Sequence, residues 1–224
     1  TTPHSQRKFG EAIWCAALQG DYVGDHEEGK PNGYGHLIRL DGKSYAGEWV
    51  EGMLSGMGQM TWPDGTSYVG AYQNNCRNGD GVFKSADGVT YKGQFVDDKM
   101  DGHGVCRFLD GREYDGEWEL GFINGKGRMT WPNGCVYTGW YSKGKKHGDG
   151  IYMWPDGRTH SGSWNEGNKN GAGVATDSEG NATHGEWKNG RLLVAGQKQK
   201  IMHVEAEADV EVSLLNDLCR PSND

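Results

Sequence analysis

A repeat of 23 residues constrains this chain more than any other feature of its sequence. The units start with an aromatic residue in six cases and with histidine or threonine in the last two, at Tyr22, Tyr45, Tyr68, Tyr91, Tyr114, Tyr137, His160 and Thr183. Two residues after each start comes a glycine, at Gly24, Gly47, Gly70, Gly93, Gly116, Gly139, Gly162 and Gly185. The eight units contain no insertion or deletion. This pattern is typical of a protein in which one structural module stacks on copies of itself.

Further glycine columns predict where the module turns. They lie 7, 11, 13 and 20 residues after the start of a unit, and of the 38 glycines only Gly10 and Gly20 fall outside the columns. Asn75 and Asp98 replace the glycine of the first of these columns. Such regular spacing indicates fixed backbone conformations rather than a disordered glycine-rich chain, and the aromatic content of 11% supports the same conclusion.

The last glycine column predicts a tight hairpin turn. Its glycine follows Asp, Asn or Glu, and three units carry a proline as well, as in Trp62-Pro63-Asp64-Gly65. Proline fixes φ at the first turn position and glycine adopts a positive φ without strain, so a turn is expected here. By contrast, the Gly-x-x-x-Gly-x-Gly stretch at Gly52–Gly58 is expected to be a looser connection between the two strands of a hairpin.

The strands of the module alternate with a period of two. In Tyr45-Ala-Gly-Glu-Trp49 the Tyr, the Gly and the second aromatic therefore point to one face, and the glycine leaves a slot for an aromatic ring of a neighbouring strand. The other strand alternates too, and puts Trp62, Phe108, Trp131 and Trp154 on one face. The prediction is an all-β protein: an elongated single-layer antiparallel sheet of eight tandem 23-residue β-hairpins.

Two segments lie outside the repeats of residues 22–190. Residues 1–21 are predicted to be an N-terminal cap, as a degenerate hairpin or, alternatively, a short helix. Residues 191–224 form an acidic C-terminal tail. In that tail a helix over about 204–218 is predicted from the spacing of Val204, Ala208, Glu211, Leu215 and Leu218. Such a helix either caps the end of the sheet or docks in the groove of a partner.

Several classes of function find no support in the composition and the spacing of reactive residues. A net charge of −8 disfavours nucleic acid as a partner. The five cysteines include no C-x-x-C pair, which predicts reduced thiols inside a cell. The histidines occupy different columns of the repeat, so no metal site is expected, and no nucleophile lies beside a base. We therefore predict a protein that is not an enzyme and has no cofactor.

Two sets of residues are candidates for binding. The second aromatics could anchor a partner peptide or helix in a groove, since aromatic side chains suit interfaces, and they are Trp49, Tyr72, Phe95, Trp118, Tyr141, Trp164 and Trp187. A basic cluster comprises Lys143, Lys145 and Lys146, with Lys169 one repeat later. Stacked loops would place these lysines along one edge, where they could contact phosphoinositide headgroups. The alternative for the lysines is a solvated loop.

The columns resemble a known repeat. Tyr45-Ala-Gly-Glu-Trp49, followed by Gly52, Gly56, Gly58 and Asp64-Gly65, is similar to the MORN (membrane occupation and recognition nexus) repeat. The resemblance covers about Tyr22–Gly190. The first unit departs from the pattern at His26 and the seventh at His160, while the eighth keeps only Gly185, Trp187 and Gly190. These weaker end units are expected to be caps.

The resemblance implies an elongated β-sheet with a role in assembly. MORN arrays occur in radial-spoke and other axonemal proteins, in membrane-junction proteins, in parasite cytoskeletal proteins, and beside kinase or SET domains. We therefore predict a scaffold that binds partner peptides or helices along an aromatic groove in a cytoskeletal or ciliary assembly. Alternatives are a phosphoinositide-binding, membrane-apposed adaptor and the targeting fragment of a larger enzyme. The expected location is the cytoplasm, cytoskeleton or cilium, and exposed end strands would allow a homo-oligomer.

Overall fold

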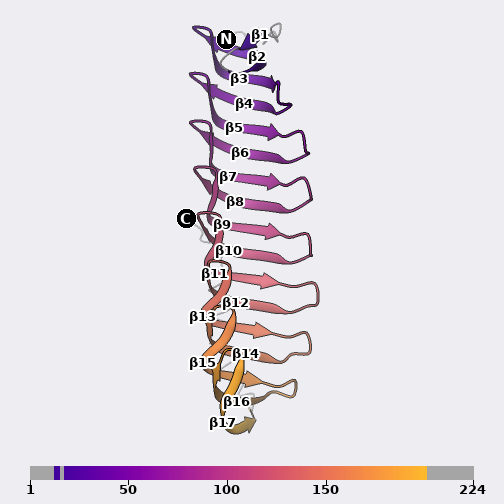
Figure 1. Ribbon diagram of the computed structural model, residues 1–224, viewed down its shortest axis with the longest axis vertical. Helices are drawn as coiled ribbons and strands as arrows, with labels where there is room; N and C mark the ends of the chain where they lie inside the picture. Colours follow the sequence, from indigo (N-terminus) through magenta and orange to yellow (C-terminus); the bar gives the residue numbers. More distant parts are fainter. Residues whose placement is uncertain (1–12, 16–17, 201–224) are drawn as a thin grey trace, which may run out of the picture. The chain divides into compact units, whose positions relative to one another are not determined.

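The chain is built entirely from antiparallel hairpins where its structure is described. The computed structural model describes residues 13–15 and 18–200, with side chains over 18–196. It comprises two compact units, Thr1–Leu109 and Asp110–Asp224. Figure 1 labels the strands of both units. The prediction of an all-β antiparallel sheet of hairpin repeats is confirmed. The helix predicted over about 204–218 lies outside the described residues, as do residues 1–12.

Unit 1 is a meander in which each strand pairs antiparallel with the next one along the chain. Its strands are β1 (Ile13–Cys15), β2 (Gly20–Glu27), β3 (Lys30–Arg39), β4 (Ser44–Val50), β5 (Met53–Thr61), β6 (Ser67–Gln73), β7 (Cys76–Lys84), β8 (Thr90–Val96) and β9 (Lys99–Arg107). The hairpins repeat with the register of the sequence columns, since Gly47 of β4 lies opposite Gly58 of β5, as Gly70 lies opposite Gly81 one repeat later.

Unit 2 continues the same plan of consecutive antiparallel pairs. Its strands are β10 (Glu113–Glu119), β11 (Phe122–Thr130), β12 (Val136–Ser142), β13 (Lys145–Met153), β14 (Thr159–Asn165), β15 (Asn168–Thr176), β16 (Asn181–Lys188) and β17 (Arg191–Lys200). The last hairpin, β16–β17, keeps the fold of the others although its sequence has lost most of the repeat columns.

The turns between hairpins have the predicted geometry. At Trp62–Thr66 the amide of Gly65 donates to the carbonyl of Trp62 (3.0 Å), and the amide of Trp62 donates to the carbonyl of Thr66 (2.9 Å). Gly65 has a φ of +89°, and the carboxylate of Asp64 accepts a hydrogen bond from the amide of Thr66 at 2.9 Å. This is a three-residue hairpin loop that ends in a left-handed glycine, which explains why Asp-Gly or Asn-Gly stands at this position in the first seven units except the one with Glu179.

The connection within each hairpin differs from the expectation of a loose loop. Between β4 and β5 it is a two-residue turn, Glu51-Gly52, with φ values of +51° and +79°. Positive φ at both residues is the signature of a turn whose twist matches the flanking strands. Gly56 and Gly58 already lie in β5, and the pairing shifts register between Gly47 and Glu48, so a β-bulge adjoins them. The looser connection predicted at Gly52–Gly58 is therefore wrong: most of that stretch is strand.

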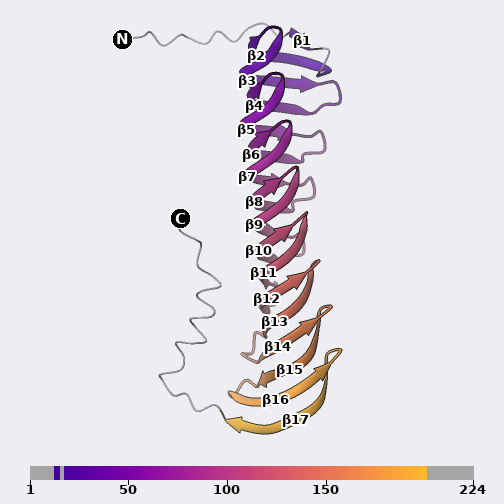
Figure 2. The ribbon, with the colours of Figure 1, turned by 90° about the vertical axis from the view of Figure 1, so that its left-hand side faces the viewer.

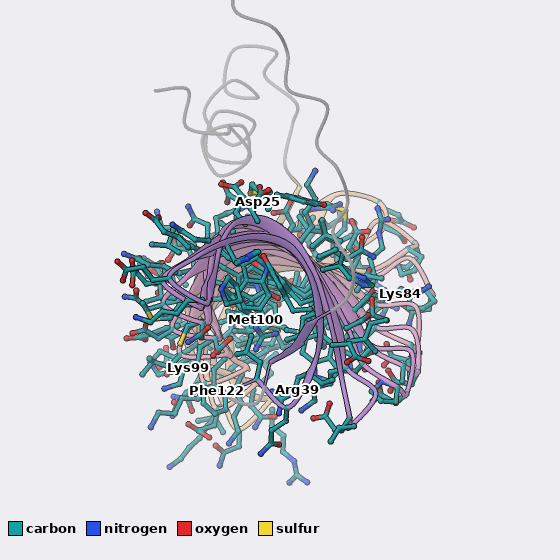
Figure 3. All side chains as sticks on the ribbon, turned by 90° about the horizontal axis from the view of Figure 1, so that it is seen from above. Asp25, Arg39, Lys84, Lys99, Met100 and Phe122 are labelled. Atoms are coloured by element: carbon teal, nitrogen blue, oxygen red, sulfur yellow. The ribbon has the colours of Figure 1, made fainter. Side chains whose placement is uncertain are left out.

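The strands are bent, so that the sheet of each unit has a concave and a convex face (Figures 2 and 3). Met100 lies inside the bend and Asp25 outside it (Figure 3). Met100 is paired with Phe95 across β8 and β9, and residues directly opposite each other in a sheet share a face. The second aromatics of the repeat are therefore on the concave face.

The first tyrosine of each repeat fills the slot that the glycines leave. The ring of Tyr45 lies over Gly47 and Gly58, where a Cβ at Gly58 would overlap the ring and one at Gly47 would meet its hydroxyl at 2.5 Å. The Tyr45 hydroxyl donates to the carbonyl of Glu48 at 3.0 Å. The predicted slot exists, but its occupant is the tyrosine of the same strand rather than a ring from a neighbouring strand. Each hairpin thus closes over its own tyrosine.

Candidate binding surface on the concave face

The second aromatics form the floor of the concave face. Trp49 meets Tyr45 of its own repeat and Tyr22 of the preceding one edge-on, with ring centroids 5.1 and 5.5 Å apart. The indole nitrogens of Trp49 and Trp164 donate to backbone carbonyls of the preceding strand, those of Gly35 and Gly150. All seven second aromatics are buried, with at most 8% of their surface exposed. Their main contacts hold consecutive repeats together, and contact with a partner stays a prediction.

A third aromatic column lies above that floor. Trp62, Trp131 and Trp154, from the ends of the second strands of their hairpins, are only half-buried. Their alternation had indicated the face but not that they would be more accessible than the second aromatics. They contact partly covered neighbours, as Trp154 does with Tyr152 at a centroid distance of 4.7 Å. These rings are aromatic side chains that the concave face offers to a ligand.

Unit 1 has a hollow of about 570 Å³ on this face. Leu37, Leu54, Met60 and Trp62 give it an apolar wall, and Tyr72 contributes a buried hydroxyl. Among the described residues that hydroxyl has no hydrogen-bond partner. The hollow therefore combines apolar surface with an unused polar atom, which is the usual make-up of a site for a peptide side chain.

An ion pair closes one side of the hollow in unit 1. The Arg77 guanidinium lies over the Phe95 ring at 5.2 Å, and its Nε donates to the Asp98 carboxylate at 3.0 Å. The backbone amide of Arg77 donates to the same carboxylate. Burial would raise the pKa of Asp98, but these hydrogen bonds and the positive charge of Arg77 hold it below its ordinary value. Asp98 is one of the two residues, with Asn75, that replace the glycine seven residues after the start of a repeat.

Unit 2 has a smaller, cationic hollow of about 230 Å³. Its wall comprises Tyr152, Trp154, Trp164, Lys146 and Lys169, together with backbone at two glycines. The Lys146 ammonium lies 4.3 Å from the centroid of the Trp164 ring and 4.6 Å from that of Tyr152. The Lys169 ammonium lies 4.7 Å from the centroid of the Trp154 ring. Both cations are held against the electron-rich faces of aromatic rings.

The structure separates the four lysines of the predicted basic cluster. Lys146 and Lys169 lie opposite Tyr141 and Trp164, so both are on the concave face. Lys143 is a turn residue with a φ of +47°. Lys145, next to Lys146 in β13, is exposed and forms an ion pair with Glu166. The structure therefore brings Lys146 and Lys169 into one hollow and leaves Lys143 and Lys145 at the turn.

Burial shapes the electrostatics of the hollow in unit 2. It lowers the pKa of Lys146 to about 8, and the charge of Lys169 adds to the effect. Burial and the charge of Arg158 lower the pKa of Lys169. Next to them His160 replaces the first tyrosine of its repeat. Burial, with Lys169 and Lys146 as further causes, lowers its pKa to about 4, so its imidazole is neutral at pH 7.

Fold and surface together define a tandem β-hairpin repeat protein whose concave face carries accessible aromatic and charged side chains. More narrowly, the chain belongs to the MORN-repeat family. The family model "MORN repeat" matches residues 22–44, 45–67, 68–90, 91–111, 114–136, 137–157 and 160–182. The MORN repeat is a non-catalytic, repeat-based interaction module. The hairpin β16–β17 lies beyond the matched residues, apart from the first two residues of β16.

Solved structures with detectable similarity include TCP domains of proteins named CPAP and SAS-4. The E1021V mutant of the TCP10 domain of Danio rerio CPAP is 15% identical with a TM-score of 0.38, over 83% of this chain and 93% of that one. The SAS-4 (dCPAP) TCP domain of Drosophila melanogaster, in complex with a proline-rich motif of Ana2, is 12% identical with a TM-score of 0.38, over 88% and 95%. No curated protein sequence is significantly similar to this chain. In the described part of the chain there is no helix long and apolar enough to cross a membrane.

Proposed function

We propose that this chain is a scaffold module that holds a peptide or helix of a partner protein on its concave face. The observation that carries the proposal is the hollow of about 570 Å³ in unit 1. Leu37, Met60 and the half-buried Trp62 present apolar surface there, and Tyr72 supplies a polar atom at its floor. An aromatic or aliphatic anchor of a partner would fill this space, as hot-spot residues do in protein interfaces.

The sharpest test compares two substitutions on opposite faces of neighbouring strands. Met60 of β5 lines the hollow, whereas Val69 of β6 is exposed on the convex face. Full-length wild-type protein, Met60→Glu and Val69→Glu would each be used for affinity purification from native cells, followed by direct binding with the partner segment identified. Wild type and Val69→Glu should bind equally, and Met60→Glu should lose binding because a carboxylate enters an apolar wall. Equal binding by all three folded proteins would refute the concave-face proposal.

Substitution of the floor itself is a weaker test. Trp118 and Tyr141, two of the second aromatics, are buried, so their replacement by alanine removes packing between repeats as well as any partner contact. A loss of binding would then report unfolding. Circular dichroism and thermal unfolding should accompany any variant of this column.

We also propose that the partner belongs to a cytoskeletal or ciliary assembly. Membership of the MORN-repeat family supports this assignment, because such arrays occur in axonemal and cytoskeletal proteins. Fluorescent tagging of the full chain in its native cells, with a microtubule marker, checks it. A diffuse signal that does not overlap with the microtubule marker would contradict the cytoskeletal or ciliary assignment. It would not contradict the proposed binding surface on the concave face.

A further inference from the structure

The repeat supplies an internal comparison for its buried cations. Arg77, Lys146 and Lys169 each lie nine residues after the start of their repeat. The backbone carbonyl of each of these residues accepts a hydrogen bond from the backbone amide 21 residues later. The amide of Asp98 donates to Arg77 at 3.0 Å. The amides of Gly167 and Gly190 donate to Lys146 and Lys169, both at 2.9 Å. The three positions are therefore structurally equivalent, in the same strand register and on the same face.

The comparison shows what the lysines lack. Arg77 receives its counter-charge from the side chain of Asp98, the residue 21 positions on. At the equivalent positions Lys146 and Lys169 have Gly167 and Gly190, and both glycines line the hollow of about 230 Å³. Within the described residues, neither lysine has a carboxylate within ion-pairing distance. The partly buried ammonium groups of Lys146 and Lys169 thus share a hollow at the positions where a carboxylate equivalent to that of Asp98 would lie.

Aromatic rings compensate these charges only in part. A cation over a ring face gains less free energy than full burial of an unpaired ion costs. The lowered pKa of Lys146 reflects this imbalance. A carboxylate in the hollow would be attracted by both ammonium groups and would be flanked by Trp154 and Tyr152.

We propose that the acidic segment 204–218 of this same chain occupies the hollow and supplies the carboxylates that Lys146 and Lys169 lack. The segment carries no lysine or arginine, and its acidic residues are Glu205, Glu207, Asp209, Glu211 and Asp217. Valine, alanine and leucine lie between them, which suits the aromatic wall. The inference does not depend on binding of any partner, since the ligand is part of the chain.

The position where the described chain ends makes this occupancy feasible. β17 ends at Lys200, which pairs with Asn181 at the start of β16. Gly190 lies beyond the other end of β16, a strand of eight residues or roughly 27 Å. An extended stretch reaches about 30 Å from residue 201 to 209 and about 36 Å from residue 201 to 211, so Asp209 and Glu211 can reach the hollow. Tethering gives the segment an effective concentration on the order of millimolar, which favours it over free ligands.

Zero-length carbodiimide cross-linking of the full chain gives the first test. Cross-links from Lys146 or Lys169 to Asp209 or Glu211 should form within one molecule, as shown by mixing light and ¹⁵N-labelled protein. The exposed pair Lys145–Glu166 is the internal positive control, because it must cross-link in any case. A sample that yields the control cross-link and none to the tail would overturn the proposal.

The second test measures competition in the full chain. A neutral-tail variant carries Glu205→Gln, Glu207→Gln, Asp209→Asn and Glu211→Gln. A labelled synthetic peptide with the natural sequence of residues 204–218 should bind this variant at least about tenfold more tightly than it binds wild type, whose own tail competes. Adding Lys146→Gln and Lys169→Gln should abolish that binding, whereas adding Lys143→Gln and Lys145→Gln should not.

Other outcomes of the second test decide against the proposal. Equal peptide binding by wild type and the neutral-tail variant would show that the tail does not occupy the hollow. Binding that survives loss of Lys146 and Lys169 would place the peptide elsewhere. Flotation of the neutral-tail variant with phosphoinositide vesicles, without peptide binding, would assign the two lysines to a lipid phosphate instead.

Discussion

Two kinds of glycine alternate along this chain, for different physical reasons. Gly65 is required by backbone conformation, because its φ is positive and open space surrounds it. Gly58 has no such φ, and its requirement is steric, because the Tyr45 ring lies on its Cα. A repeat with several invariant glycines thus contains turn glycines and glycines that accommodate a ring, and only the structure tells them apart.

The steric role of Gly58 leads to a stability prediction. Gly58→Ala should lower the free energy of unfolding by roughly 1–3 kcal/mol or more, as overpacking a filled site does. Gln59→Ala, one residue on and exposed on the other face, should change it by less than about 0.5 kcal/mol. Urea denaturation of both full-length variants measures the difference. Similar stabilities would mean that the tyrosine ring can move aside at little cost.

His160 should make stability depend on pH. Its folded-state pKa of about 4 is below its ordinary value of 6.5, so the unfolded chain takes up a proton that the folded chain excludes. The contribution is complete above pH 6.5 and is lost as the pH falls toward 4, by roughly 2–3 kcal/mol. His160→Tyr, which restores the residue of the column, should remove this slope in chemical denaturation between pH 7 and 4.

A matched control for His160 is available within the repeat. His36→Tyr changes an exposed histidine on the convex side of β3, so it should keep the wild-type slope. If His160→Tyr and His36→Tyr both retain the full pH dependence, the titrating group is not His160.

At the scale of the hairpin, the second aromatic joins one module to the previous one. Trp164 contacts His160 of its own repeat and Tyr137 of the preceding repeat, and covers the Lys146 ammonium. Neighbouring hairpins are therefore connected by ring contacts as well as by strand pairing. Such nearest-neighbour coupling is the basis of cooperativity in repeat proteins.

Two tryptophans in neighbouring repeats test this role. Trp164→Ala should lower the free energy of unfolding by about 3–5 kcal/mol, since it removes a buried ring and its hydrogen bond to Gly150. Trp140→Ala should have a much smaller effect of about 1 kcal/mol or less, because Trp140 is on the convex face and 45% exposed. Thermal and urea unfolding would compare them. Equal losses would show that convex-face packing matters as much as the concave floor.

The hairpin also shows what the sequence could and could not predict. The columns predicted the strands, the Asp-Gly turns and the buried face, because each depends on local spacing. The sequence could not predict on which face of the sheet Lys146 and Arg77 lie, because this depends on the turn within the hairpin having two residues. If the connection is a looser loop, the sequence does not determine which residues of the following strand point to the concave face. The pairing of Arg77 with Asp98, 21 residues on, followed only from the register.

At the scale of the whole molecule, charge and edge exposure are unevenly distributed. The segment 204–218 alone carries five acidic residues and no lysine or arginine, against a net charge of −8 for the whole chain. In the described part of unit 2, β17 pairs with β16 on one side, while β13 pairs with both β12 and β14. Strands with a single partner open more easily than strands with two.

Hydrogen exchange should reflect this difference. Amides of β17 should exchange at least about tenfold faster than those of β13, as measured by mass spectrometry on the full chain at low concentration. Protection of β17 that increases with protein concentration would indicate that β17 pairs with a second copy of the chain. Uniform protection at every concentration would contradict the expected gradient.

The charge arrangement at Arg77 and Asp98 has a consequence for reading related arrays. The cation nine residues after the start of one repeat lies beside the residue seven after the start of the next. Where that second residue is acidic, it pairs with the cation; where it is glycine, the cation has no counter-charge from that position. Single substitutions at that second position, seven residues after the start of a repeat, could therefore move a recognition position from repeat to repeat without altering the fold. Diversification within such arrays would then be visible as exchanges between glycine and aspartate at one column.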